Sequence, residues 1–308
     1  MGLGIKTRIR FTRKAINYSL KSTQRVKSLF LRSLLLCHSL EKGMGITNVR
    51  KGYGQKKADE LISILIKMNE MSYNNTYEFK ESLAVLKAYF SFHEKQNTDV
   101  LYLKKKAESI LKIDHAPFNG GYRIIEHSEL MKGKEIDYES FVNSRHSMRT
   151  YNSTPINKDI INKVISIAKR APSACNREPW KFYYSLDVKK SQVIAAALPS
   201  QSFLKDIPYF GVVTVDKSLF NQDEIYQWYI NGGIFLQSLV NAFHSQGIGS
   251  CIFQYPVFID SKQELYKFVK IPKNEELIAA VGFGYYPDQA KCICAERRPN
   301  ILIAKEID

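Results

Sequence analysis

The spacing of apolar residues predicts a helical first part and a second part in which helices and strands alternate. Three early segments repeat apolar residues every three to four positions, as amphipathic helices do. Gly and Asn residues such as Gly54, Asn74 and Asn97 separate these segments. The predicted helices of the first part are 58–71, 78–92 and 99–111.

The second part carries short apolar runs that favour strands between amphipathic helices. The breaker-rich stretch 115–121 (HAPFNGG) separates it from the first part. The predicted strands are 180–186, 209–215, 250–253 and 276–282, and the predicted helices are 157–170, 188–197, 225–246 and 262–269. We therefore expect an α+β fold with a mixed or mainly antiparallel sheet flanked by helices. The expected parts are a helical region 1–115, a linker 116–140 and an α+β domain 141–308.

The charge of the chain is concentrated at its front. The net charge is +15, yet residues 1–57 hold fourteen of the 45 Lys and Arg residues and a single acid, Glu41. The remaining chain is almost neutral, which argues against a basic DNA-binding fold throughout. With 44% hydrophobic and 24% charged residues, the composition is that of a folded chain with a core.

Residues 1–36 interleave Ile and Leu with Lys and Arg, which predicts an amphipathic helix. Three interpretations stay open: a helix packed on the domain, a contact with an anionic membrane surface, and, as the least favoured, nucleic-acid binding. No apolar run is long enough to span a bilayer, and no signal-peptide cleavage pattern follows 29–37. We expect a cytoplasmic protein, with the inner face of the membrane as a candidate docking surface.

Two features give no site of their own. The five cysteines form no C-x-x-C pair, so no metal site is predicted. Their odd number argues against a disulfide framework. The run 38–43 (HSLEKG) is interpreted as a helix C-terminus capped by Gly43.

Three clusters in the second part carry candidate chemistry. The first, 144–149 (SRHSMR), offers two guanidinium groups, which can bind phosphate oxygens bidentately. The alternative interpretation of this cluster is an exposed basic loop. The second, 171–180 (APSACNREPW), fixes Ser173 and Asn176 in a proline-bounded turn that could read a heterocycle edge, or it is ordinary turn chemistry. The third joins 282–287 (GFGYYP) to Arg297 and Arg298, a candidate anion contact.

In order and spacing, these clusters resemble the nitroreductase family of flavoenzymes over about residues 140–308. The resemblance rests on 145–149 (RHSMR), 172–180 (PSACNREPW), 247–250 (GIGS) and 282–287 (GFGYYP) with a later Arg. It implies FMN bound at a homodimer interface. It also implies that the cofactor-binding residues are Arg145, His146, Ser147, Arg149, Pro172, Ser173, Ala174, Asn176, Gln254, Arg297 and Arg298. Many relatives carry a Lys two residues before the final Arg, whereas this chain has Ala295 and Glu296.

The activity implied by the resemblance is transfer of hydride from NADH or NADPH, through FMN N5, to a small-molecule acceptor. The flavin carries the chemistry, so no catalytic side chain is required, and Arg149 is the candidate for stabilising the reduced flavin. Two alternatives remain open. One is an FMN-dependent dehydrogenase or oxidase of a biosynthetic intermediate, for example of a surface polysaccharide. The other is a non-catalytic flavin-binding protein of an envelope assembly.

Overall fold

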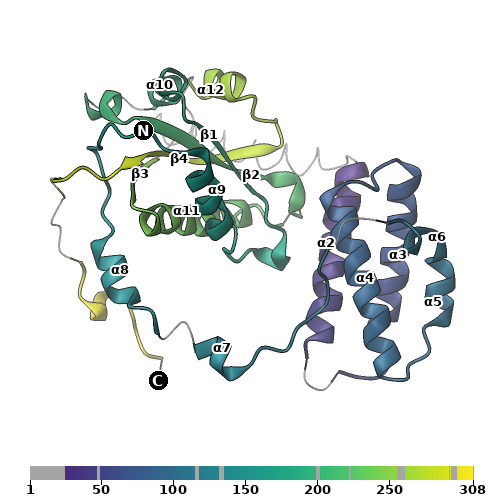
Figure 1. Cartoon of the computed structure of the whole chain (residues 1–308). Helices are drawn as coiled ribbons and strands as arrows, with labels where there is room; N and C mark the ends of the chain where they lie inside the picture. The colour runs from purple at the N-terminus through teal and green to yellow at the C-terminus, as the bar shows by residue number, and fades with distance from the viewer. Residues whose placement is uncertain are drawn as a thin grey trace.

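The computed structural model describes residues 25–46, 49–114, 118–131, 135–198, 202–221, 223–254, 261–290, 292 and 297–307. Figure 1 shows a helical bundle on one side, an α+β body on the other, and a long connection between them. Within the described residues, none of the helices is long and apolar enough to cross a bilayer.

Helices of the first part pack into a bundle with its own apolar core. The bundle consists of α2 (Arg25–Met44), α3 (Gln55–Glu70), α4 (Tyr77–Lys95), α5 (Leu101–Lys106) and α6 (Glu108–Leu111). The core side chains Leu40, Leu61, Leu65, Phe79 and Tyr89 are fully buried. The predicted helices 58–71 and 78–92 are confirmed, whereas 99–111 is divided near Ala107 into α5 and α6.

The apolar side of α2 is used inside this bundle. Leu36, Cys37 and Leu40 are buried in the core, and Leu29 and Phe30 pack against it. This favours the interpretation that the helix packs on the protein, at least from Leu29 onward. Residues 1–24 of the predicted amphipathic helix lie outside the described residues.

The interpretation of Gly43 as a helix cap is wrong, because α2 continues to Met44. Gly43 is instead buried where the ring of Tyr53 crosses the helix, and a Cβ atom there would overlap that ring. Tyr53 OH donates a hydrogen bond to Ser39 O, so the ring is fixed in this position. The glycine therefore allows the close approach of the α2–α3 connection.

A four-stranded antiparallel sheet forms the centre of the second part. Its strand order is β1-β2-β4-β3, with β1 (Trp180–Ser185), β2 (Tyr209–Asp216), β3 (Ile248–Gln254) and β4 (Glu275–Tyr285). All four predicted strands are found, and β3 and β4 are longer than predicted. The α+β fold class with a preceding helical region is confirmed.

Helices cover both faces of the sheet. One face packs on α9 (Lys158–Ala168) and α11 (Gln227–Ser245), and the other on α10 (Val188–Ala196), η3 (Ser202–Asp206) and α12 (Ser261–Val269). Side chains of β2 alternate between these cores: Val213 and Val215 face α11, while Phe210 and Val212 face α10. The sheet is thus buried on both sides, which explains why its strands read as continuous apolar runs.

Short elements complete the path of the chain. The connection between the two parts carries α7 (His127–Met131) and α8 (Tyr138–Ser144), the loop after α9 carries η2 (Ala174–Asn176), and η4 (Lys217–Leu219) follows β2. Near the C-terminus, η5 (Asn300–Leu302) belongs to an exposed tail. Helix α2 contacts both η2 and η4, so the bundle lies against this end of the body.

The Gly43 contact predicts an asymmetric pair of substitutions. Gly43→Ala should lower the free energy of unfolding by about 1–3 kcal/mol, because the new methyl group overpacks Tyr53. Gly45→Ala, whose Cβ would meet atoms no closer than 3.5 Å, should change it by no more than about 0.5 kcal/mol. Urea unfolding followed by circular dichroism measures both values, and equal losses would contradict this account of the α2–α3 connection.

Candidate functional site

The first cluster lies along the edge strand β3. Ser147 forms a parallel bridge with Ser250, and Met148 N donates to Ser250 O at 3.0 Å. This close approach requires Gly249, because a Cβ there would lie 2.7 Å from the Met148 side chain. The structure therefore brings the SRHSMR and GIGS motifs side by side.

The third cluster joins them through its aromatic residues. Tyr151 OH donates to Met148 O at 2.8 Å, and Asn152 N donates to Tyr285 O at 3.1 Å. A Cβ on Gly284 would meet the Tyr151 ring at 2.8 Å, so this glycine also permits the close packing. The GFGYYP turn thus supports the segment that carries the two arginines.

Helix α8 and the C-terminal end of α11 close this corner. His244 links them, because its Nε2 lies 3.0 Å from Ser144 Oγ and its Nδ1 lies 2.7 Å from Tyr286 OH. Burial lowers the pKa of His244, and nearby Arg145 and His146 lower it further. A neutral imidazole here avoids adding charge beside Arg145.

The two guanidinium groups of this corner are available to an anion. Arg145 and Arg149 are half-buried, and neither is ion-paired with a carboxylate of the described chain. Arg149 stacks over the Phe203 ring at 5.6 Å and donates to Ser147 O at 3.4 Å. His146 and Ser147 are exposed beside them. This donor set fits a phosphate group.

The remaining predicted contacts around this corner are less defined. Gln254 is the exposed last residue of β3, and Arg297 and Arg298 are exposed on the C-terminal tail. Ala295 and Glu296 lie outside the described residues. In the part of the chain that is described, no group of three or more His, Cys, Asp and Glu residues could hold a metal ion.

The second cluster forms a turn with an unusual backbone. Cys175, Asn176 and Glu178 have φ angles of 52°, 52° and 43°, the left-handed region that costs a non-glycine residue about 1 kcal/mol or more. Ser173 stabilises this path, since its Oγ accepts a hydrogen bond from Glu178 N at 3.0 Å. Ser173 and Ala174 are half-buried, whereas Pro172 and Asn176 are exposed.

Two residues that the sequence analysis did not single out hold this turn in place. Asn231 of α11 is buried, and its Oδ1 accepts from Ala174 N at 2.8 Å while its Nδ2 donates to Gln227 O at 2.6 Å. Arg177 is also buried, and it donates to both carboxylate oxygens of Glu224 at 2.6 and 2.9 Å. An asparagine within an apolar helix was the signal that could have identified Asn231.

The first and second clusters are not brought together within one protomer. The turn is anchored at Asn231, near the N-terminal end of α11, and the arginine corner is anchored at His244, near its C-terminal end. These two residues are about 20 Å apart along the helix, at about 1.5 Å per residue. Each cluster thus lies at its own end of α11.

Residues 142–227 match the family model described as the Nitroreductase family. The matched part of the chain is nitroreductase-like. The 4-nitrobenzoate reductase of Pseudomonas putida is 25% identical over 203 residues, covering 50% of this chain and 87% of that protein. A protein of Methanothermobacter thermautotrophicus is named a candidate NADH dehydrogenase/NAD(P)H nitroreductase. It is 24% identical over 154 residues, and the match spans 50% of this chain and 80% of the Methanothermobacter protein.

Among solved structures, an FMN-dependent nitroreductase from Clostridium difficile is similar with a TM-score of 0.44 and 23% identity. The matched region spans 50% of this chain and 90% of the Clostridium difficile protein. The nitroreductase-like part contains both arginines of the first cluster and the whole turn of the second. The bundle precedes the matched residues.

The Asn231 contact predicts a loss of stability that is centred on the turn. Asn231→Ala leaves the Ala174 amide without its buried acceptor, so the free energy of unfolding should fall by about 2–3 kcal/mol. Gln237→Ala, on the exposed side of the same helix, should change it by no more than about 0.5 kcal/mol. Urea unfolding gives the values, and unchanged hydrogen exchange at Ala174 in the first variant would contradict the assigned role.

The Arg177–Glu224 pair predicts a dependence of stability on pH. Hydrogen bonding from Arg177 lowers the pKa of Glu224 from its ordinary 4.5 in the folded protein. Its stabilising contribution is therefore complete above about pH 4.5 and is lost as the pH falls through the lowered pKa. Glu224→Gln should cost about 3 kcal/mol at pH 7, because the buried guanidinium loses its counterion, and progressively less below pH 4.5.

A surface ion pair serves as the control for this measurement. Glu94→Gln removes the exposed partner of Lys104 and should cost less than about 1 kcal/mol at every pH. Chemical unfolding between pH 3 and pH 7 compares the two variants, and a pH-independent loss in Glu224→Gln would refute the linkage.

Proposed function

We propose that this protein is an FMN-dependent oxidoreductase that uses NADH or NADPH to reduce a small-molecule acceptor. The observation that carries the proposal is the pair of half-buried arginines, free of carboxylate partners within the described chain, held by β3 and two close-packed glycines. The match to the nitroreductase family supports it, as do the relatives named for nitroreductase activity. We also propose that residues 141–308 form the catalytic domain and residues 1–115 a separate helical one.

The residues fit FMN in complementary ways. Arg145, Ser147 and the tail residues Arg297 and Arg298 would hold the phosphate and ribityl chain, and Arg149 would face the N1–O2 edge of the ring. When bound, FMN supplies reversible hydride transfer at its N5 atom. The role of Arg149 is electrostatic: its fixed positive charge favours the negative charge that reduction places on that ring edge. His146, beside it, is assigned to the binding site.

We further propose that two copies of the chain build each site. The exposed side of α11 carries Tyr226, Ile230 and Ile234, spaced four residues apart on one face, and a Cβ at Gly233 would meet no atom within 4 Å. An apolar helical stripe of this kind suits a twofold-symmetric contact between identical subunits. A twofold axis perpendicular to α11 pairs the two helices antiparallel.

This antiparallel arrangement has a direct consequence for the flavin site. The N-terminal end of one α11 lies beside the C-terminal end of the other, so the turn of one subunit approaches the arginine corner of its partner. Pro172, Ser173, Ala174 and Asn176 would then line the isoalloxazine of the site whose phosphate the partner holds. The separation of about 20 Å within one protomer is what makes the second copy necessary.

The first test of the proposed function is an absorbance spectrum of the full-length protein with added FMN, followed by anaerobic titration with NADH and with NADPH. A flavin spectrum that either nicotinamide bleaches supports the proposal. Protein that binds no FMN refutes it. Bound FMN that neither nicotinamide reduces would favour the non-catalytic alternative instead.

A mixing experiment tests the sharing of sites. Arg149→Ala alone and Asn176→Gly alone should each lose reductase activity, and the glycine preserves the left-handed backbone while removing the amide. Subunits exchanged between the two variants should recover about a quarter of wild-type activity, because half the dimers are mixed and each has one intact site. If both clusters served one protomer's own site, mixing would restore nothing.

A further inference from the structure

The connection between the bundle and the body carries a concentration of exposed apolar side chains. We call its described residues, 118–131 and 135–142, the arm. Eight of these 22 residues are large, apolar and exposed. They are Phe118, Tyr122, Ile124, Ile125, Met131, Ile136, Tyr138 and Val142. Connections between domains are ordinarily polar, so this composition indicates that the arm is a contact surface.

The arm begins in close contact with the bundle. Gly121 N donates a hydrogen bond to Glu41 Oε1 at 3.0 Å, and a Cβ on Gly120 would lie 2.6 Å from the backbone of α4. The ring of Phe118 meets the ring of Tyr77 edge-on, with 5.3 Å between their centroids. The start of the arm is therefore fixed on the bundle.

The arm ends on the body, next to the arginine corner. The ring of Phe141 lies 4.8 Å from the ring of His244, and Ser144 Oγ lies 3.0 Å from His244 Nε2. None of the residues of α8 is buried, and Tyr138 and Val142, one helical turn apart, stay exposed. Helix α8 is therefore attached to the body while part of its apolar surface remains uncovered.

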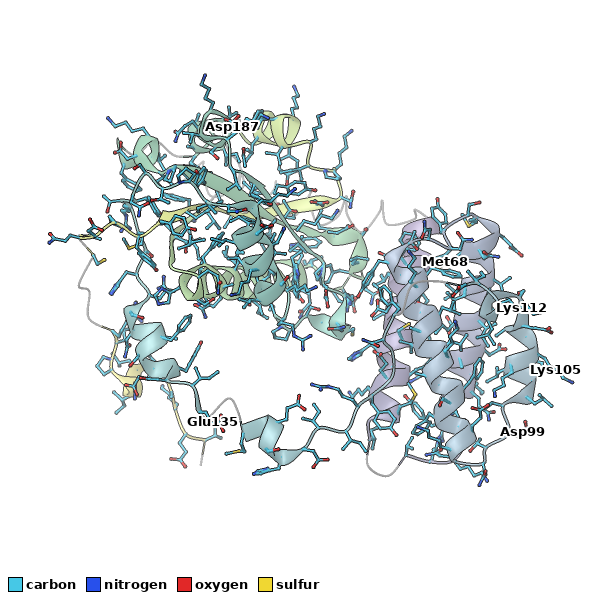
Figure 2. The ribbon with its side chains drawn as sticks, in the orientation of Figure 1. Met68, Asp99, Lys105, Lys112, Glu135 and Asp187 are labelled. Carbon is cyan, nitrogen blue, oxygen red and sulfur yellow. The ribbon has the colours of Figure 1, made fainter. Side chains whose placement is uncertain are left out.

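Between its two ends, the arm lies apart from the sheet and from α11. Arg123 is paired with Glu129 at 2.9 Å, within the arm itself. Neither α7 nor α8 packs broadly on another helix or strand of the described chain. Figure 1 shows the arm on the side of α11 that faces away from the sheet, and Figure 2 shows Glu135 on this path, clear of the sheet. The described part of the protomer therefore leaves the apolar side chains of the arm open.

The arm joins the two ends of α11 by a path that is longer than their separation. The bundle contacts η2, which Asn231 binds near one end of α11, and Ser144 is bound to His244 near the other end. These ends are about 20 Å apart. Residues 122–143 span at most about 50 Å, since helical residues rise about 1.5 Å each and extended ones about 3.3 Å. The arm is thus long enough to pass around part of a second molecule.

The exposed stripe of α11 is too small to form a stable dimer alone. Tyr226, Ile230 and Ile234 are 62%, 50% and 37% exposed. At on the order of 100 Å² for each half-exposed side chain of this size, they supply about 300 Å². A stable interface buries about 800 Å² on each partner. The eight apolar side chains of the arm bring the total to about 1,100 Å² by the same estimate, so the arm completes an interface of sufficient size.

The charge of the arm favours a protein partner over a membrane or a nucleic acid. Residues 118–143 hold three Lys and Arg against five Asp and Glu, a net charge of −2. Residues 144–308 hold 20 Lys and Arg against 15 Asp and Glu, a net charge of +5. Anionic lipid and nucleic acid bind basic surfaces. An acidic and apolar arm instead complements the basic body of a second copy of this chain.

We propose that residues 118–142 form a dimerisation arm, which is anchored at both ends on its own protomer and packs along its length on the body of a second copy. This inference rests on the second copy that the proposed function requires. It adds a contact surface that lies almost entirely outside residues 142–227, the part matched to the nitroreductase family. Because the dimer is twofold symmetric, each subunit both provides an arm and receives one.

The arm connects the dimer contact to the arginine corner. Helix α8 ends at Ser144, and Arg145 follows it directly. When the second copy covers Tyr138 and Val142, α8 is held between two subunits, and the backbone that enters the arginine corner is fixed. Formation of the dimer should therefore raise the affinity for FMN, although none of the arm residues is assigned to the flavin site.

Sedimentation velocity of the full-length protein measures how much the arm contributes to the dimer. Ile124 and Ile136 are 83% and 64% exposed, so their replacement leaves the core of the protomer intact. Ile124→Asp combined with Ile136→Asp should raise the dimer Kd about 100-fold, because two apolar contacts are lost and two charges are buried. Leu101→Asp, at a 56% exposed position of α5, should leave it unchanged. A double variant with the wild-type Kd overturns the proposal.

Photo-crosslinking identifies what the arm contacts. Benzoylphenylalanine is placed at Ile136, and isotope-labelled and unlabelled subunits are mixed, allowed to exchange and irradiated. Cross-links between a labelled and an unlabelled chain, with the second peptide from residues 144–308, support the proposal. Cross-links confined to one chain, including those to residues 1–24, overturn it, and so does the absence of any cross-link.

FMN binding, measured on the same samples, separates this inference from the proposed function. A dimer weakened by the two Asp substitutions, in a protein that binds no FMN, refutes the function and leaves the arm intact. A flavin-binding dimer with the same Kd in every variant refutes the arm and leaves the function intact. A wild type that binds FMN and is monomeric at every concentration refutes both the arm and the shared site, without affecting the assignment of the cofactor.

Discussion

Helix α11 is the constraint on which the rest of the site depends. It is packed under the sheet by Phe235, Leu239 and Phe243, so neither of its ends can move independently of the core. One end holds the Pro172–Pro179 turn through Asn231, and the other end holds the arginine corner through His244. The length of this one helix sets the distance between the two clusters.

The turn shows how a buried polar group can support a strained backbone. Cys175, Asn176 and Glu178 adopt left-handed conformations that local sequence does not favour. The compensation comes from a hydrogen bond to α11, from the Ser173 hydroxyl, and from a guanidinium–carboxylate pair that ties the turn to the loop before α11. Such strain persists only where surrounding contacts determine the path, and here these contacts come from three separate elements.

The position of the bundle adds a second body to this arrangement. Its α2 uses its apolar side for the bundle core, and the same helix contacts η2 and η4 of the body. Gly121 N donates to Glu41 Oε1 at 3.0 Å, so the same carboxyl group also fixes the start of the long connection. The HSLEKG run therefore has three roles within six residues. Leu40 is buried in the bundle core, Gly43 allows the close approach of Tyr53, and Glu41 binds the connection. The interpretation of the run as a helix cap predicted none of these roles.

The sequence by itself determined the elements and the chemical groups of this protein. Apolar periodicity located the sheet strands and most helices, because burial of a helix stripe or of both sheet faces leaves a regular pattern. Proline-bounded turns and the paired arginines located the candidate flavin contacts. Only the tertiary structure decided that Asn231 and Arg177 hold the turn, that the two clusters lie at opposite ends of α11, and that Glu81 of α4 is buried. These facts depend on contacts between residues far apart in the chain, and the period of a local pattern carries no information about which distant surface will cover it.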